Sequence, residues 1–205
     1  TLAPGESIVA EAGAMASMSR HVQVYTRFNG GFWRALMRKF FGGESLFINT
    51  FHCPAGGPPA ELVLTQPTPG DLEEVELTGQ RLFLQPGAYV ASTEDVKLGM
   101  GYAGFSSWFG GEGLFKLQVS GHGKVWMGGY GGIYTREVQN EYIVDTGHIL
   151  AYEPTLGLSV GLSGGIFSSF FGGEGFISRM RGQGKVYLQS RSIDGLAQWT
   201  NRHLW

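Results

Sequence analysis

The chain has 205 residues, which is enough for one large β domain or two small ones. Hydrophobic residues make up 42% of it and charged residues 16%, which is typical of a globular protein and excludes a disordered one. Fifteen basic and seventeen acidic side chains leave a net charge of −2, so the composition gives no general attraction to nucleic acid or to anionic lipid.

The chain has one cysteine, Cys53, which cannot form an internal disulfide, so nothing requires an oxidising compartment. We expect Cys53 to be a small, partly buried hydrophobic residue. The first residues carry no basic segment followed by an apolar run, and the uncharged stretch 154–173 is rich in glycine and alternates like a strand. We therefore expect a cytoplasmic protein without a membrane-spanning segment.

One phrase occurs three times in the chain, at spacings of 68 and 62 residues (110 − 42 and 172 − 110). A near-identity that recurs in this way indicates a duplicated structural unit, so the architecture is the first thing to derive. The phrase is Phe-Gly-Gly-Glu, and its residues are Phe41, Gly42, Gly43, Glu44, Phe109, Gly110, Gly111, Glu112, Phe171, Gly172, Gly173 and Glu174.

The first copy opens with a turn at Pro4-Gly5 and an apolar strand that ends at Ala10. A second strand is predicted from Met15 to Val24. Apolar residues then recur with helical spacing over 32–41, a segment without a counterpart in the other copies. A turn rich in proline and glycine and a strand over 61–64 close the copy.

The second and third copies follow the same order. We take Gly87 and Gly147 to be equivalent to Gly5, because each precedes an apolar strand that ends in alanine. Further strands are predicted over 95–100 and 155–162, and each motif is followed by a hairpin, 120–127 and 181–188, at an offset of 61 residues. The tail 193–199 favours a helix.

Short strands with Gly and Pro at their corners, at a spacing of about 8–12 residues, are typical of an all-β sandwich or barrel. We predict three repeats, 1–78, 79–140 and 141–205, with one or two short helices. One repeat has an apolar face without a partner, so the three should pack as one compact unit, with the Phe-Gly-Gly-Glu blocks in equivalent places.

The repeated motif favours a structural corner over a chemical site. Two adjacent glycines between aromatic residues allow a positive φ or a close backbone approach, and a role needed in every copy is usually geometric. The alternative stays open: Glu44, Glu112 and Glu174 could be related acidic sites that line one pocket.

The insertion 32–41 is the basic, aromatic element of the chain. We expect its apolar face to pack on the body of the protein or on a neighbouring subunit, because free exposure would favour aggregation. The alternative is contact with a partner or a membrane surface through its basic residues. The apolar face comprises Phe32, Trp33, Leu36, Met37 and Phe40.

Motifs of known chemistries fail on inspection. Residues 99–104 fit G-x-G-x-x-G but lack the helix that a dinucleotide fold requires next. Five scattered histidines show no metal-ligand spacing, and there is no G-x-S-x-G. We therefore predict no catalytic residue, no bound metal, no cofactor and no enzymatic activity.

With its three motifs and the glycine turns ahead of them, the chain resembles the bacterial relatives of the mitochondrial altered-inheritance-of-mitochondria family, in the TRAP-like superfamily. Residues 109–113 carry the most specific part of the resemblance, while Ser45 departs from it in the first copy. The resemblance implies a duplicated β-sandwich of the double-stranded β-helix kind, assembly into homo-oligomers and no catalytic residues. The mitochondrial relative is linked to inner-membrane organisation.

Three hypotheses from different classes follow. The leading one is a non-enzymatic structural or interaction protein that associates with itself and scaffolds other proteins near a membrane surface. The second is RNA binding of the TRAP-like type, although the net charge makes nucleic acid an unexpected partner; its local basic cluster is Arg179, Arg181, Lys185 and Arg191. The third is a small-ligand binder that uses the barrel interior.

Overall fold

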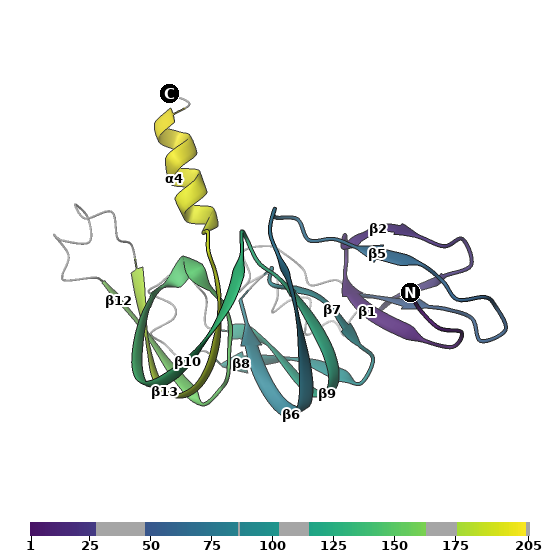
Figure 1. Ribbon diagram of the computed structural model, residues 1–205, viewed down its shortest axis with the longest axis horizontal. Helices are drawn as coiled ribbons and strands as arrows, with labels where there is room; N and C mark the ends of the chain where they lie inside the picture. The colour runs from purple at the N-terminus through teal and green to yellow at the C-terminus, as the bar shows by residue number, and fades with distance from the viewer. Residues whose placement is uncertain (28–47, 86, 103–114, 163–175, 204–205) are drawn as a thin grey trace.

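The computed structural model describes residues 1–27, 48–85, 87–102, 115–162 and 176–203, and these form an all-β protein with one short helix (Figure 1). The predicted fold class is confirmed. The first five strands are β1 (Ser7–Glu11), β2 (Met15–Met18), β3 (Gln23–Arg27), β4 (Ile48–His52) and β5 (Leu62–Leu64). The next four are β6 (Leu72–Leu84), β7 (Tyr89–Thr93), β8 (Val96–Tyr102) and β9 (Phe115–Gly128). The last elements are β10 (Ile133–Asp145), the 3-10 turn η1 (Thr146–His148), β11 (Ile149–Tyr152), β12 (Leu156–Leu162), β13 (Phe176–Gln189) and helix α4 (Ile193–His203).

Eleven of the described strands form one antiparallel sheet, in the order β10-β13-β11-β6-β9-β7-β1-β4-β3, with β12 beside β13 and β8 beside β9. Strands β2 and β5 form a second, two-stranded sheet. Antiparallel pairing agrees with the short turns that join most of these strands, because a two- to five-residue loop can only reverse the chain.

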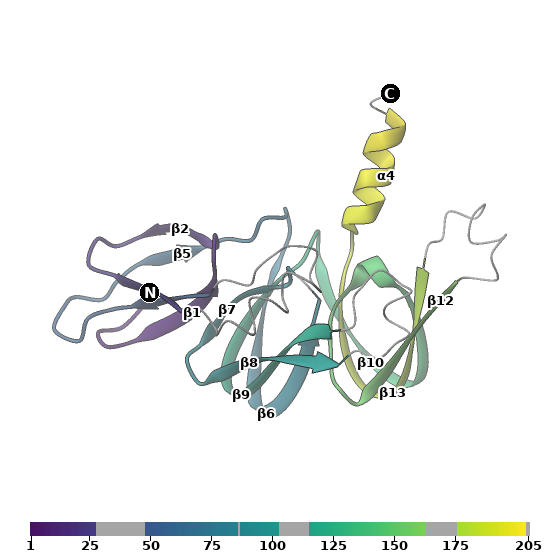
Figure 2. The same ribbon diagram turned by 180° about the vertical axis from the view of Figure 1, so that it is seen from behind.

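The strand pairing follows the same plan three times. In each unit a first strand and a second, interrupted strand lie on either side of a return strand. We call these units 1, 2 and 3, and Figures 1 and 2 show them in a row with unit 2 in the middle. In chain order they consist of β1, β2–β3 and β4–β5; β6, β7–β8 and β9; and β10, β11–β12 and β13.

A β-bulge at one place in every unit fixes which residues are equivalent. The register between the second strand and the return strand shifts after Met15, after Tyr89 and after Ile149. Each of these residues stands two positions after a glycine, so Gly13 is the counterpart of Gly87 and Gly147. The predicted equivalence of Gly5 with those two glycines is therefore wrong.

Gly5 has counterparts elsewhere in the units. The offset of 74 residues from Gly13 to Gly87 (87 − 13) leads from Gly5 to Gly79, and a further 61 leads to Asn140 (140 − 79). All three have positive φ, at 86°, 111° and 78°. The unit thus needs a bend in its first strand as well as a turn after it, and the local likeness of Pro4-Gly5 to Pro86-Gly87 hid the difference.

The units also begin earlier than the sequence suggested. The expected boundaries after residues 78 and 140 fall inside β6 and β10, which are the first strands of their units. At the offset of 61 these two strands share a single identical residue, Glu76 with Glu137, so no motif revealed their equivalence. The strand predicted from Met15 to Val24 is likewise two strands, β2 and β3, which pair with different strands.

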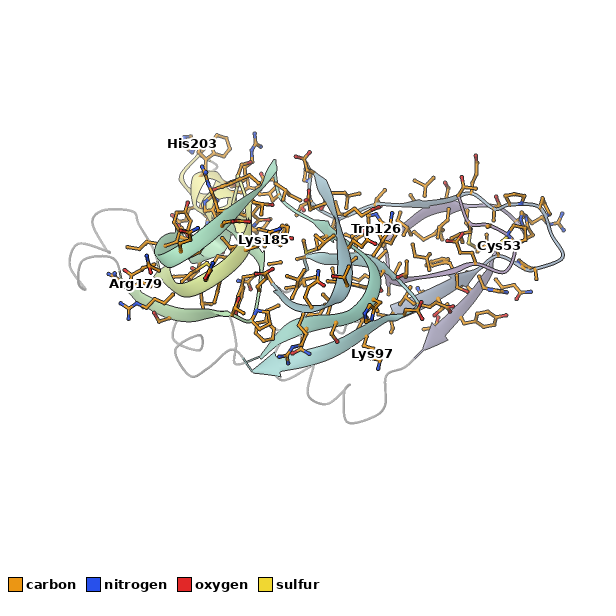
Figure 3. The ribbon with its side chains drawn as sticks, turned by 60° about the horizontal axis from the view of Figure 1, so that its bottom comes forward. Cys53, Lys97, Trp126, Arg179, Lys185 and His203 are labelled. Carbon is orange, nitrogen blue, oxygen red and sulfur yellow. The ribbon has the colours of Figure 1, made fainter. Side chains whose placement is uncertain are left out.

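Each unit has its own hydrophobic core, and neighbouring units share residues. Leu150 and Tyr187 of unit 3 and Ile48 of unit 1 pack into the core of unit 2. Cys53 is fully buried in the core of unit 1, more deeply than expected; Figure 3 shows it at the opposite end of the row from Arg179. The shared residues make the row one packed body.

The long return strands bend where a glycine lets another backbone approach. Gly121 in β9 and Gly182 in β13 are equivalent (182 − 121 = 61), with φ of +112° and +129°. A Cβ atom would lie 2.7 Å from the Asp95 carbonyl oxygen at the first position and 2.5 Å from the Thr155 carbonyl oxygen at the second. Only glycine fits such contacts without a backbone shift.

The Phe-Gly-Gly-Glu blocks and the insertion 32–41 lie outside the described residues, within 28–47, 103–114 and 163–175. In chain order each of these segments joins a second strand to its return strand. The strand ends that flank them are paired in all three units: Arg27 with Ile48, Tyr102 with Phe115, and Leu162 with Phe176. The helix expected over 32–41 and the roles of the three glutamates stay predictions.

Candidate assembly surfaces

Two junctions of the same design join the units. At the first, β1 pairs with β7, with Ala10 opposite Ala91. At the second, β6 pairs with β11, with Leu84 opposite Ala151. Leu84 is 74 residues after Ala10 and Ala151 is 60 after Ala91, which are the offsets between equivalent first-strand and second-strand positions, so the two junctions have the same register.

The first junction also carries a buried tyrosine. The Tyr89 hydroxyl donates to the Val9 carbonyl of β1 at 3.2 Å and lies 3.0 Å from Ser92 Oγ. Burial raises the pKa of this phenol well above its usual range, so the group stays neutral and remains a hydrogen-bond donor. A neutral, satisfied hydroxyl is compatible with the dry environment of the junction.

Burial along the second strands shows what a junction does to the strand that it covers. Every residue of β11 is buried, and so are the first four residues of β7. The equivalent strand in unit 1 is β2, which no preceding unit covers, and all four of its residues are exposed. Met15 is 40% exposed and Met18 39%, whereas the counterpart of Met15 in unit 2, Tyr89, is 1% exposed.

The opposite end of the row has the complementary feature. Among the described strands β10 pairs only with β13, so its other edge has no partner there. Ile143 on this strand is 49% exposed, while its counterpart Leu82 in β6 is 1% exposed because unit 3 covers it. The chain therefore presents one half of a junction at each end.

A cleft of about 670 Å³ runs along the row beside the junctions. Its polar side chains are used by the fold: the Gln66 amide nitrogen donates to two backbone carbonyls at 3.1 Å, and Gln189 bridges the Tyr130 amide and the Gly147 carbonyl at 2.9 Å each. They hold neighbouring segments together and do not converge on the space. Equivalent turns of the three units line the cleft: Glu11, Ala12, Gly13, Ala14, Gln85, Gly87, Ala88, Ile149 and Leu150.

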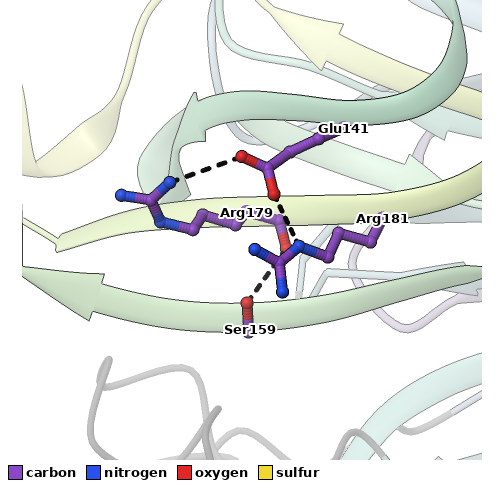
Figure 4. A network of polar contacts seen from close by, with 4 residues as sticks. All are labelled: Glu141, Ser159, Arg179 and Arg181. Atoms are coloured by element: carbon purple, nitrogen blue, oxygen red, sulfur yellow. Dashed lines mark hydrogen bonds and ion pairs between the residues drawn. The ribbon is translucent and has the colours of Figure 1, made fainter.

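The basic cluster of unit 3 is accompanied by acidic residues. Figure 4 shows Glu141 of β10 between Arg179 and Arg181 of β13, at 3.4 Å and 2.5 Å, with Ser159 on the neighbouring strand β12. Lys185 stands opposite Glu137 in the same strand pair. Two carboxylates thus offset much of the positive charge that the RNA hypothesis relied on.

Arg181 holds the pKa of the Glu141 carboxyl below its usual range, chiefly through the direct hydrogen bond. Replacing Arg181 with glutamine should raise that pKa toward the ordinary range, as measured by NMR titration of the side-chain carboxyl. A lowered folded pKa contributes stability above the unfolded pKa, and this contribution is lost as the pH falls through the folded value. The variant should therefore lose stability less steeply in acid.

The matched control for this change is Lys97→Gln on β8 of unit 2, which removes one positive charge far from Glu141 (Figure 3). It should leave the titration of Glu141 unchanged, and at neutral pH neither variant should change stability much, because exposed ion pairs contribute little. An unaltered Glu141 titration in Arg181→Gln would show that the pairing has no electrostatic effect.

Helix α4 projects away from the row (Figures 1 and 2) and confirms the helical tail expected from 193, with an end at His203. Its apolar side chains stay exposed, with Trp199 60% exposed and stacked on His203. No helix within the described ranges has the length and apolar character needed to cross a membrane. In the same residues no three metal-binding side chains come together, and the expectation of a metal-free protein awaits metal analysis.

The residues nominated from the sequence all lie outside the described part of the chain, so the surfaces found here are different ones. Met15, Met18 and Ile143 gave no signal of their own, since isolated apolar residues in short strands read as core. A comparison of the copies in the correct register, with Gly13 matched to Gly87, would have singled out β2 as the strand without a preceding unit.

Comparisons with known proteins place the chain in context. It is similar to an uncharacterized protein of Streptococcus pyogenes serotype M6, with 28% identity over 98% of this chain and 83% of the relative. A crystal structure of a Streptococcus pyogenes protein superposes with a TM-score of 0.77 at 26% identity, covering 98% of this chain and 91% of that one. The family described as "Mitochondrial biogenesis AIM24" matches residues 1–191, a range that ends just before α4. The chain therefore belongs to the AIM24 family, as its three Phe-Gly-Gly-Glu motifs indicated.

Proposed function

We propose that this protein is a non-enzymatic interaction protein that assembles with copies of itself and holds other proteins, beside a membrane surface. The observation that carries the proposal is the exposure of β2, an apolar strand whose counterparts in units 2 and 3 are buried by a neighbouring unit. Exposed methionines on a strand edge are a typical contact surface, because they combine apolar area with an open hydrogen-bonding edge. The family description, mitochondrial biogenesis, supports the membrane-side role.

Two further observations support an interaction protein over the other candidates. The polar side chains that line the cleft are engaged in structural hydrogen bonds, which argues against a ligand or catalytic site there. The basic side chains of unit 3 face Glu141 and Glu137, and the whole chain has a net charge of −2, which argues against an RNA surface.

Self-association is tested by light scattering on the purified chain over a range of micromolar concentrations. The expected mass is a multiple of 22.2 kDa that falls on dilution, because the exposed area at each end is modest and should give a reversible contact. A mass of 22.2 kDa at every concentration would rule the proposal out.

A further inference from the structure

We infer that copies of the chain join head to tail, with the free edge of β10 in one copy adding to the free edge of β2 in the next, in the register of the internal junctions. The inference rests on the proposed self-association and specifies its surfaces. It places Asp145 of one copy opposite Ser17 of another, and Val144 opposite Met18.

The register follows from the repeat. In both internal junctions the first strand of one unit pairs with the start of the second strand of the following unit. First-strand positions advance from Ala10 to Leu84 and then to Asp145 (84 + 61). Second-strand positions in the opposite direction lead from Ala151 to Ala91 and then to Ser17 (91 − 74). A further junction of the same kind would therefore join Asp145 to Ser17.

A second copy is the occupant that fits these edges. Figures 1 and 2 show β2 and β10 in the outer units of the row, with unit 2 between them, so one chain does not join its own two ends. Another copy supplies the complementary edge with the same twist and the same bulge that the internal junctions use. The contact is thus continuous with an interface that the chain already forms twice.

The burial pattern agrees with this assignment. The internal junctions cover the counterparts of Met15 and Met18 on one side and of Ile143 on the other, and these three residues are exposed at the free ends. The central pair is more polar than its internal counterparts, since Ser17 and Asp145 replace Ala91 and Leu84. A polar central pair lets each edge stay in water before assembly, which fits a reversible contact.

Because each chain carries one edge of each kind, the assembly is heterologous. Contacts of this type close into a ring if the rotation between copies allows it, and otherwise extend as a filament. They do not give the two-fold dimer in which one edge meets the same edge of a partner.

Engineered cysteines test the pairing directly. Leu84 and Ala151 neighbour the pair in which the Gln85 amide donates to the Leu150 carbonyl, so Ser17 and Asp145 should form a non-hydrogen-bonded pair with Cα atoms about 4.5 Å apart. That separation suits a disulfide. Full-length Ser17→Cys and Asp145→Cys are purified separately, mixed in equal amounts, oxidised with oxidised glutathione and run on a non-reducing gel; the native Cys53 is buried.

The expected result is a cross-linked species of twice the chain mass that forms at least tenfold more in the mixture than with either variant alone. Equal cross-linking in the mixture and in the single variants overturns the inference, as does a dimer formed by one variant alone. If the wild type is an oligomer by light scattering while the mixture fails to cross-link, self-association stands and this pairing is wrong. If the wild type is a monomer, both fall.

A second pair of variants guards against cysteine variants that assemble poorly. Met18→Asp places a charge on the β2 edge and should reduce the mass to that of one chain, while Leu72→Asp, equally exposed at the start of β6 in unit 2, should not. Circular dichroism must show the same β content in both. An oligomer of unchanged mass in Met18→Asp contradicts the proposed edge.

Discussion

Replacing Leu84 with alanine is expected to lower the free energy of unfolding by about 2–5 kcal/mol, the range for a leucine deleted from a well-packed core. Leu84 is fully buried in the core of unit 2, between Leu117 of β9 and Ala151 of β11. Its loss leaves a cavity at the junction of units 2 and 3. For a chain of this size the melting temperature should fall by roughly 5–15 °C, measured by calorimetry or by circular dichroism.

The matched control is Leu72→Ala, the same change at the start of the same strand, where the side chain is half exposed. It should cost less than about 1 kcal/mol, because most of the removed surface already faces water. If the two variants melt together, Leu84 does not hold the junction as its burial implies.

Replacing Gly182 with alanine is expected to destabilise the fold by about 2–5 kcal/mol, the combined cost of a left-handed backbone for a non-glycine residue and of overpacking. The φ of this residue is +129°, and the added Cβ would lie 2.5 Å from the Thr155 carbonyl oxygen. Backbone atoms on both sides leave no flexible side chain to move aside. Denaturant unfolding of the purified variant measures the loss.

Gly157→Ala in the neighbouring strand β12 is the control for this substitution. Its Cβ would lie 3.6 Å from the Arg181 carbonyl oxygen, an ordinary contact, and its φ is in the normal range. Alanine should be neutral or slightly stabilising there, since glycine loses more conformational freedom on folding. Gly121→Ala should behave like Gly182→Ala because its environment repeats in unit 2; a neutral Gly121→Ala would argue against that equivalence.

The local rules of β structure were readable from the sequence. Turns with glycine and proline bounded the strands, period-two alternation marked them, and the 61-residue offset between the hairpins of units 2 and 3 appeared as a direct likeness. The family followed from the Phe-Gly-Gly-Glu motifs, whose positions are set by chain order. These features depend on neighbours in the chain, so a sequence displays them.

Equivalence within unit 1 could not be derived in the same way. Positive φ is needed at Gly5 and again at Gly13, and only the strand pairing tells which glycine corresponds to Gly87. The likeness of two Pro-Gly turns outweighed the correct match, because turn chemistry is similar wherever a chain bends. Asn140 shows the same limit, since an asparagine can occupy a left-handed position that its counterparts fill with glycine.

By itself, the sequence determined the all-β class, the threefold repetition, the family and the buried character of most apolar residues, because these follow from periodicity and local turn chemistry. The tertiary structure alone decided which apolar residues remain exposed. Met18 and Ile143 lie in strands like those around them, yet their exposure depends on whether a neighbouring unit exists to cover them. Burial at a junction is a property of two strands distant in the chain, and its absence at the two ends of the row is what points to assembly.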